Sequence, residues 1–295
     1  NPVTGMPIEP KRQVRERWGG PIVTSGYEMY ALPFEVFRGQ NQPLWADIHV
    51  PPDAAPGLYR GTFTVTCADS SRASIPVSLT VWGFALPDGP IHHNHFGGMR
   101  NVTRFFGVEF ESERYNNIEM QYCAMLAEHR INPPIPRRFL PSANEDGSLK
   151  IDPGRTRELK AYIDKYHVTD FEVPRAPFRD PVGNDREKTS RYVREYLNYL
   201  KENGWDKGAY YYMHDEPNLA ENYQLVRDYG ALVHKAAPGL KCLVVEQTYA
   251  QDPSWPDIDP AVDIWCPLWA FIDRGTIRRK IAQGDDVWSY TALAQ

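Results

Sequence analysis

From about residue 91 onward, stretches typical of short strands alternate with stretches typical of amphipathic helices, and this alternation constrains the fold more than any other feature. In the helical stretch 111–130, for example, Ile118, Tyr122, Met125 and Leu126 recur at helical spacing. Strands that alternate with helices favour a parallel sheet with right-handed crossovers. We expect helices at residues 111–130, 155–166, 188–203, 219–236 and 273–282, and strands at 91–96, near 133–136, and at 169–173, 209–215, 241–246, 262–266 and 287–290.

Seven strands with helices between them indicate a (β/α)8 TIM-like barrel that is truncated before its last βα unit. An open doubly wound sheet is the alternative, although no glycine-rich phosphate loop follows any of the expected strands. The absent closing strand would put both the stability and the activity of a barrel in question.

The first part of the chain has a different pattern and predicts an all-β sandwich. Residues 1–88 are rich in Pro and Gly, and the turn Asp53–Gly57 precedes a stretch in which apolar and polar residues roughly alternate. Several short strands at this spacing favour a β-sandwich, which we interpret as a structural module. We therefore expect a multidomain chain with a sandwich at 1–88, a barrel at 89–295, and sandwich strands at 27–37, 43–50, 57–67 and 71–82.

Composition excludes several classes of protein. The net charge of −5 and the pI near 5.9 give no basic surface, so we expect no nucleic-acid partner. No apolar run approaches the length of a membrane span, so we expect no membrane insertion. The 8 Trp, 17 Tyr and 12 Phe residues suit the apolar faces of sugars, but they would serve core packing equally well.

The cysteines show no metal-binding or disulfide spacing. Cys67, Cys123, Cys242 and Cys266 are far apart and form no CxxC motif, so we interpret them as buried apolar residues. Cys242 and Cys266 lie on successive expected strands, where a bridge would fit the geometry but is not indicated. The chain begins with Asn1 and Pro2 rather than Met, which indicates either a removed leader or a fragment.

The segment Ala209-Tyr-Tyr-Tyr-Met-His-Asp-Glu-Pro-Asn218 places two acids at the end of a strand. Its aromatic residues favour a strand, and Pro217 ends the strand because it has no N–H to donate. Asp215 and Glu216 would thus lie at the carboxyl end, where parallel α/β folds carry their chemistry. The alternative is an Asp that caps the next helix beside a solvated Glu.

Two carboxylic groups in one site suggest glycoside hydrolysis. An ordinary retaining glycosidase needs carboxyls about 5 Å apart on opposite sides of the sugar, and only Glu246 could be such a nucleophile opposite Glu216. Adjacent residues have Cα atoms only about 3.8 Å apart, which is too close for opposite faces of a sugar ring. This spacing fits a mechanism in which the two acids have different roles. In substrate assistance the 2-acetamido oxygen of the sugar attacks the anomeric carbon, Asp215 holds the acetamido N–H, and Glu216 protonates the leaving oxygen.

The motif Met213-His-Asp-Glu-Pro217 resembles the Asp-Glu signature of glycoside hydrolase family 123 and of a related family of formerly unknown function. Residues 44–62 are similar to a segment of the N-terminal sandwich of these families, with a Trp strand, a Pro-Asp turn and a Pro-Gly-x-Tyr-x-Gly strand. Glu128-His-Arg-Ile-Asn132 is a weaker third match.

The resemblance implies a β-N-acetylgalactosaminidase that acts through an oxazoline or oxazolinium intermediate, with Asp215 orienting the acetamido group and Glu216 as acid/base. It also implies a terminal β-linked N-acetylhexosamine glycan as partner, no cofactor, and a secreted or periplasmic location in a bacterium. The family continues past the seventh strand, so a truncated chain is expected.

Other residues are candidates for substrate binding. The aromatic side chains at the ends of the sixth and seventh expected strands could line a sugar subsite, with core packing as the alternative. Polar residues near strand ends could contact sugar hydroxyls. The candidates are His95, Arg175, Glu246, Tyr249, Trp265, Trp269, Trp288 and Tyr290. The His92-His-Asn-His95 run has no helical metal-binding spacing, so we expect no metal site.

Three functions therefore remain open from the sequence. The first is an exo-acting, substrate-assisted glycosidase. The second is a carbohydrate-binding or inactive barrel protein. The third is a double-displacement glycosidase that uses Glu216 and Glu246. The choice of galacto or gluco epimer, the linkage and the oligomeric state do not follow from the sequence.

Overall fold

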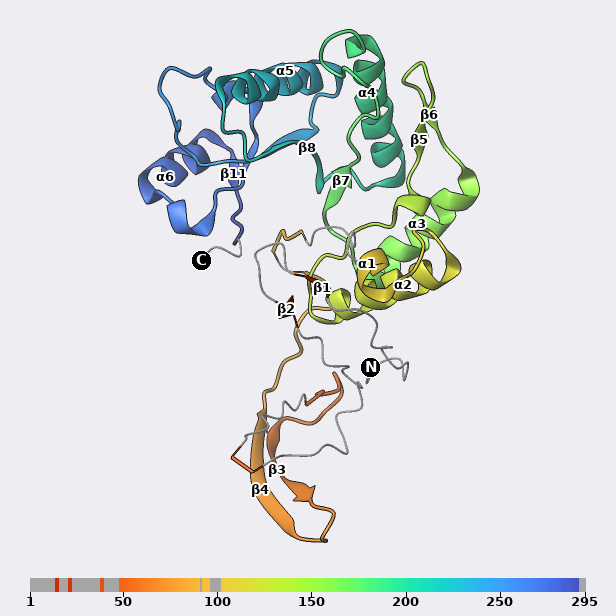
Figure 1. The fold of residues 1–295 in the computed structure, drawn as a ribbon, viewed down its shortest axis with the longest axis vertical. Coiled ribbons are helices and arrows are strands. Elements are labelled where there is room, and N and C mark those ends of the chain that lie inside the picture. The colour runs from red at the N-terminus through yellow and green to blue at the C-terminus, as the bar shows by residue number, and fades with distance from the viewer. Residues whose placement is uncertain are drawn as a thin grey trace. The chain divides into compact units, whose positions relative to one another are not determined.

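The computed structural model describes residues 14–15, 21–22, 38–39, 48–90, 92–95 and 102–291. The chain divides into two compact units, Asn1–Leu86 and Pro87–Gln295. Figure 1 shows the elements of each unit.

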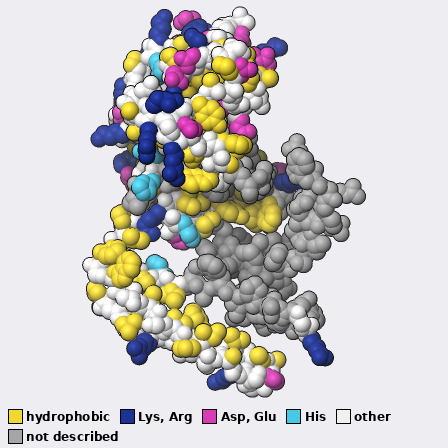
Figure 2. Space-filling model, turned by 90° about the vertical axis from the view of Figure 1, so that its left-hand side faces the viewer, with side chains coloured by type: hydrophobic (Ala, Val, Ile, Leu, Met, Phe, Trp, Pro, Cys, Tyr) yellow, Lys and Arg dark blue, Asp and Glu magenta, His cyan; other side chains and the backbone are white. Residues whose placement is uncertain are grey.

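The described part of the N-terminal unit contains two antiparallel pairs of strands. β1 (Val14–Arg15) pairs with β2 (Pro21–Ile22). β3 (Gly57–Thr66) pairs with β4 (Arg72–Val81) over their whole lengths, as expected from the alternation in this stretch. Many apolar side chains of this hairpin are exposed, and Figure 2 shows such side chains gathered along it; they include Leu58, Tyr59, Phe63 and Ile75.

The predicted β-sandwich is wrong for the residues that the structure describes. A sandwich needs a second sheet over the apolar face of the first, whereas here each sheet has two strands and β3 is exposed along nearly its whole length. The expected strand at 27–37 lies outside the described residues, and residues 48–50 of the expected strand 43–50 are not in a strand. Alternation predicted the hairpin correctly, but it does not reveal what covers the hairpin.

Five parallel strands form the main sheet of the C-terminal unit. Their order is β11-β10-β9-β8-β7, so each strand lies beside the one that precedes it in the chain. A single backbone bridge between Leu268 and Tyr290 extends the contact beyond β10 and β11. The strands are β7 (Phe171–Val173), β8 (Ala209–Asp215), β9 (Lys241–Val245), β10 (Ile264–Trp265) and β11 (Asp286–Val287).

The helices of this unit match most of the helical stretches expected from the sequence. Side chains cap three of them: Ser112 accepts from the N–H of Tyr115, Asp152 accepts from the N–H of Gly154, and Asp273 accepts from the N–H of Thr276. The α-helices are α1 (Val102–Phe106), α2 (Glu113–Glu128), α3 (Pro153–Tyr166), α4 (Arg186–Asn203), α5 (Ala220–Ala236) and α6 (Arg274–Gln283). Shorter elements are η1 (Arg137–Phe139), β5 (Ser142–Ala143), β6 (Leu149–Lys150), η2 (Asp259–Ala261) and η3 (Trp269–Phe271).

The strand order places the large core on one face of the sheet. Right-handed crossovers that all step in one direction keep their helices on the same side, and α4 and α5 contact each other there (Figure 1). Tyr211 and Met213 of β8 are buried in this core with Cys242 and Val244 of β9. From α4 and α5 the core receives Tyr192, Val193, Tyr196, Leu197, Leu200, Tyr223, Val226, Leu232 and Val233.

The other face of the sheet carries a smaller cluster of aromatic and aliphatic side chains. Tyr210, Leu243 and Ile264 are buried there, and Tyr212, Val245 and Trp288 pack against them. We call this the open face, because the crossover helices lie on the opposite side. Among the described residues, side chains of β8, β9 and β10 contact one another on this face.

The predicted (β/α)8 barrel is also wrong, because the described strands form an open five-stranded sheet with β7 and β11 as edges. Residues 92–95 and 133–136 are not strands. Pro133, Pro134 and Pro136 have no N–H for a ladder. Side chains connect this region to the sheet instead: Asn94 Oδ1 accepts from the N–H of Asn132, and Asn132 Nδ2 donates to the carbonyl of Asp170 at 3.1 Å.

The close packing of α5 on η2 gives a test of this core. A methyl added at Gly230 would lie 2.5 Å from both Cβ and O of Ala261. Gly230→Ala should therefore lower the free energy of unfolding by about 1–3 kcal/mol, although alanine favours a helix interior by about 1 kcal/mol. Urea denaturation measures the change.

Gly275→Ala in α6 is the matched control, because the nearest atom to its added methyl is Asp273 Oδ1 at 3.4 Å. We expect this variant to be neutral or slightly more stable than the parent chain. Equal effects of the two substitutions would contradict the packing of α5 on η2.

Candidate functional site

A β-bulge in β8 determines which way the candidate acids point. The parallel pairing with β9 runs from Tyr212 opposite Leu243 to His214 opposite Val244, so Met213 is an extra residue in β8. Asp215 then lies opposite Val245. Since paired positions of parallel strands face the same side, Asp215 shares the open face with Tyr212. Bulges re-aim side chains in this way beside many active sites.

Asp215 is exposed and is held by a tyrosine from its own strand. The Tyr212 hydroxyl donates to Asp215 Oδ1 at 2.8 Å. Arg175, a residue expected at the substrate, instead contacts Tyr212: its Nε donates to the carbonyl oxygen of Tyr212 at 3.2 Å, and its guanidinium lies 4.9 Å from the centre of the Tyr212 ring. Burial and the bond to Asp215 raise the pKa of Tyr212, so Tyr212 remains a protonated donor at neutral pH.

Glu216 turns away from the strand direction into a cavity. Its φ of 47° is in the left-handed region, and its N–H donates to the carbonyl of Val245 at 3.0 Å. The hydroxyl of Tyr290, which we expected at the wall of a subsite, donates to Glu216 Oε1. Burial first, and then the bond to Glu216, raise the pKa of Tyr290, which keeps it protonated. Adjacent acids are thus held by two different tyrosines.

The cavity lies at the carboxyl ends of β8 and β9 and has a volume of about 380 Å³. It brings together four of the candidate residues, although they are far apart in the sequence: Glu216, Glu246, Tyr249 and Tyr290. Gln247 and Gln251 also line it. Asp215, His95, Arg175 and the three candidate tryptophans are not among its lining residues.

Glu246 is the buried acid of this cavity, with an exposed fraction of 3%. Nε2 of Gln251 donates to both of its carboxyl oxygens, at 2.9 and 2.8 Å, and the N–H of Gln247 donates to Oε1. Burial raises the pKa of Glu246 above its ordinary value, and the negative charge of Glu216 adds to this effect. Burial thus favours the protonated form of Glu246.

The candidate tryptophans have three different environments. Trp265 is buried, its indole N–H donates to Asp285 at 3.0 Å, and the Lys280 ammonium lies 4.2 Å from the centre of its ring, so this Trp belongs to the core. Trp269 is 63% exposed, and its backbone N–H donates to the carbonyl of Tyr290 at 2.9 Å. Trp288 packs edge-on against Tyr210 of the open face.

The histidines near residue 95 make contacts with β7, β8 and the segment before β7. His95 Nδ1 lies 3.1 Å from the hydroxyl of Tyr210, and its Nε2 lies 3.5 Å from Glu172 Oε2. His93 Nδ1 pairs with the buried carboxylate of Asp170, and the His93 ring stacks on Trp288. These rings support the open face and have their polar partners within the chain.

Sequence reasoning missed Tyr212 and Gln251, which hold the two carboxyls. The aromatic pattern predicts only that Tyr212 lies in a strand. Its position three residues before Asp215 brings the two side chains to the same face only when the strand contains a bulge. Gln251 follows β9 in an irregular segment and carries no motif. The contacts around Glu246 depend on this segment folding back over the end of β9, which no local pattern predicts.

Among the described residues, no helix has the combination of length and apolar character needed to cross a bilayer. No family model matches the chain, and no curated protein matches it. One similar solved structure is a putative glycerophosphoryl diester phosphodiesterase from Silicibacter pomeroyi, with a TM-score of 0.32 and 13% sequence identity. The match covers 47% of this chain and 45% of that chain, so the chain spans less than half the length of that structure.

The raised pKa of Glu246 predicts a pH dependence of stability. The native chain keeps this proton above the ordinary pKa of 4.5, where the unfolded chain has released it. The free energy of unfolding should therefore fall as the pH rises from about 4.5 through the folded-state pKa. Glu246→Gln removes this titration, so its free energy of unfolding should fall less steeply over that interval. Urea unfolding at several pH values measures both slopes.

Glu202→Gln is the control, because Glu202 is an exposed residue of α4 outside the cavity. Its pH dependence should match that of the parent chain. Parallel curves for Glu246→Gln and the parent chain would mean that Glu246 is ionised at no cost to the fold.

Proposed function

We propose that this protein is a glycoside hydrolase that releases a terminal β-linked N-acetylhexosamine, with N-acetylgalactosamine as the expected sugar. The observation that carries the proposal is the pair of adjacent acids at the end of β8, each hydrogen-bonded to a different tyrosine, with Glu216 on the wall of the cavity. The resemblance of the Asp-Glu-Pro motif to glycoside hydrolase family 123 agrees with this assignment. The same resemblance motivates our proposal of a secreted or periplasmic location.

The proposed reaction uses the acetamido group of the substrate as nucleophile. Its carbonyl oxygen attacks the anomeric carbon, and the bond to the leaving oxygen breaks as Glu216 donates a proton to that oxygen. Asp215 accepts a hydrogen bond from the acetamido N–H and stabilises the oxazolinium ion. Water then attacks the anomeric carbon and gives a proton to Glu216, while the bond between the anomeric carbon and the acetamido oxygen breaks. This step regenerates the acetamido group, and the two displacements together retain the configuration.

The hydrogen bonds around the two acids support these separate roles. Tyr212 uses Oδ1 of Asp215, which leaves Oδ2 to accept from a substrate N–H. Tyr290 uses Oε1 of Glu216, which leaves Oε2 to serve a leaving group or water. A volume of about 380 Å³ suits a single sugar residue, since small-molecule sites occupy roughly 300–1,000 Å³. The size of this cavity is therefore compatible with our proposal of an exo-acting enzyme that holds one terminal sugar.

A double-displacement mechanism with Glu216 and Glu246 is the second candidate, because both carboxyls line the same cavity. A nucleophile must be ionised and must present a free oxygen to the sugar. Burial raises the pKa of Glu246, and both of its oxygens accept from Gln251. These contacts suit a group that shapes the cavity better than they suit a nucleophile.

Hydrolysis of an aryl β-N-acetylgalactosaminide tests the proposal. We expect the parent chain to release the aryl group. Replacing the 2-acetamido group of the substrate by hydroxyl should abolish turnover of both the galacto and the gluco epimer. Glu216→Gln should decrease kcat by about 10²–10⁴-fold. Asp215→Ala should decrease kcat to a similar extent because the acetamido group loses its partner. Glu202→Gln should have no effect.

Turnover of the 2-hydroxy substrate at an undiminished rate would favour the double-displacement enzyme, and Glu246→Gln would then abolish it. Saturable binding of N-acetylgalactosamine without release of the aryl group would favour a carbohydrate-binding protein. If the folded protein shows neither turnover of the substrate nor binding of the sugar, the assignment is rejected.

Tyr212→Phe tests how Asp215 is held. A hydrogen bond to a charged group contributes about 1.5–3 kcal/mol, so kcat should decrease roughly tenfold to a hundredfold. Tyr199→Phe is the matched control, because it removes a tyrosine hydrogen bond of 3.2 Å to Thr156 far from the acids. Equal kcat values for the two variants would show that Tyr212 is not a positioning residue.

A further inference from the structure

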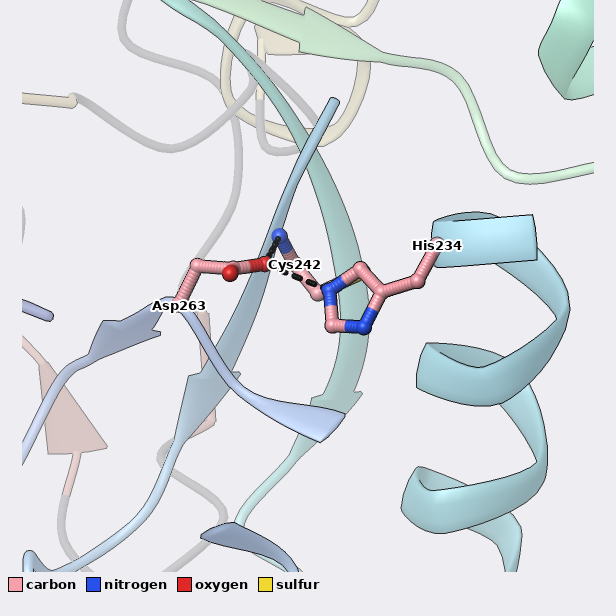
Figure 3. A group of neighbouring side chains, drawn as sticks. All are labelled: His234, Cys242 and Asp263. Carbon is pink, nitrogen blue, oxygen red and sulfur yellow. Dashed lines mark hydrogen bonds and ion pairs between the residues drawn. The ribbon is translucent and has the colours of Figure 1, made fainter. Parts of the chain in front are cut away.

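A second group of chemically active side chains lies at the amino ends of β9 and β10, whereas the cavity lies at the carboxyl ends of β8 and β9. His234 is on the last turn of α5, Cys242 is the second residue of β9, and Asp263 immediately precedes β10. Figure 3 shows the His234 ring and the Asp263 carboxylate directed toward each other beside β9. One ligand atom from each of the three residues lies within 4.8 Å of the other two.

The fold fixes the position of each of these residues. The N–H of Asp263 donates to the carbonyl of Cys242 at 2.9 Å, so the backbones of the two residues are joined. In return, the N–H of Cys242 donates to Asp263 Oδ2 at 2.7 Å. The same oxygen lies 2.8 Å from Nε2 of His234. The cluster is thus in place without any rearrangement of strands or helices.

The three ligand types select a class of metal ion. A thiolate, an imidazole and a carboxylate are the protein ligands of Zn²⁺, whereas Mg²⁺ and Ca²⁺ prefer oxygen ligands alone. Cys242 and Asp263 would carry two negative charges, which a divalent cation balances. Four ligands at 2.0–2.3 Å from such an ion are roughly 3.3–3.8 Å from one another. The ligand atoms of the cluster lie within 4.8 Å of one another, and His234 Nε2 and Asp263 Oδ2, now 2.8 Å apart, would have to separate slightly to admit the ion.

The exposure of the cluster differs from residue to residue in a way that suits metal entry. Cys242 is fully buried, whereas the side chains of His234 and Asp263 are 35% and 37% exposed. An ion can therefore approach from the solvent side and keep a water as its fourth ligand. Because a thiol binds a metal ion as the thiolate, binding of the ion must release the proton of Cys242.

We propose that His234, Cys242 and Asp263 form a binding site for one zinc-class divalent cation, which ties α5 to the amino ends of β9 and β10. The site is independent of the proposed glycosidase activity, because it lies at the other end of the sheet. Sequence reasoning predicted no metal site, since these ligands are 8 and 21 residues apart and form no metal-binding motif. The alternative is an ordinary hydrogen bond between helix and strand without metal.

Cobalt titration of the chelator-treated 295-residue chain tests the site. Co²⁺ bound to a thiolate gives a near-ultraviolet charge-transfer band and visible d–d bands. We expect both to saturate at one equivalent, to disappear when Zn²⁺ is added, and to be accompanied by a higher Tm with Zn²⁺. Cys242→Ser should lose the charge-transfer band, and His234→Gln and Asp263→Asn should each weaken Co²⁺ binding at least tenfold.

Cys123→Ser is the matched control, because Cys123 is a fully buried cysteine of α2 outside the cluster. It should keep the band and the affinity of the parent chain. Circular dichroism of each variant establishes that it is folded, and if Cys242→Ser is not folded, the two other variants decide. Absence of the charge-transfer band in the parent chain, or a band that persists unchanged in His234→Gln and Asp263→Asn, would overturn the proposal and leave the helix–strand hydrogen bond.

Discussion

The site depends on the register between β8 and β9, and in particular on the extra residue at Met213. With strict alternation, Tyr210, Tyr212 and His214 would share the open face and Asp215 would point toward the helices. The bulge reverses this arrangement after Tyr212, so that Asp215 pairs with Val245 and accepts from the Tyr212 hydroxyl. Both faces of β8 are packed, and a slip of register would therefore disrupt the core as well as the acids. Packing and chemistry are coupled in one strand.

The order of the strands explains why polar chemistry collects at the ends of the sheet. The sequential order puts α4 and α5 on one face, where Tyr196 and Tyr211 are buried among aliphatic side chains. Ionisable groups would be costly there, since a buried charge must be paired or neutralised. At the carboxyl ends, Glu246 meets this requirement through Gln251 and a raised pKa. At the amino ends, Asp263 meets it through His234 and the N–H of Cys242.

The sequence predicted the elements with strong periodicity and the position of the acids at a strand end. The helix 188–203 and the strand that ends at Asp215 are confirmed, because apolar spacing and Pro217 are local signals. The expected strands at 133–136 and, in its described residues 92–95, at 91–96 were wrong: prolines interrupt the first segment, and side-chain hydrogen bonds connect this region to the sheet in place of a ladder. Trp265 was expected at a sugar and lies in the core. Which aromatic residues meet at a cavity depends on contacts between distant segments, and composition cannot supply these.

The backbone at Glu216 links the fold to the proposed chemistry. A residue with a Cβ in the left-handed region costs roughly 1–2 kcal/mol relative to the right-handed conformation. Two contacts hold Glu216 there: its N–H donates to Val245, and its carboxyl accepts from Tyr290. Glycine would adopt this φ without strain but would have no carboxyl to place in the cavity. The conformation also separates the two neighbours, since Asp215 stays on the open face while Glu216 turns into the cavity. In the proposed reaction, this separation lets the two adjacent acids contact different atoms of one sugar.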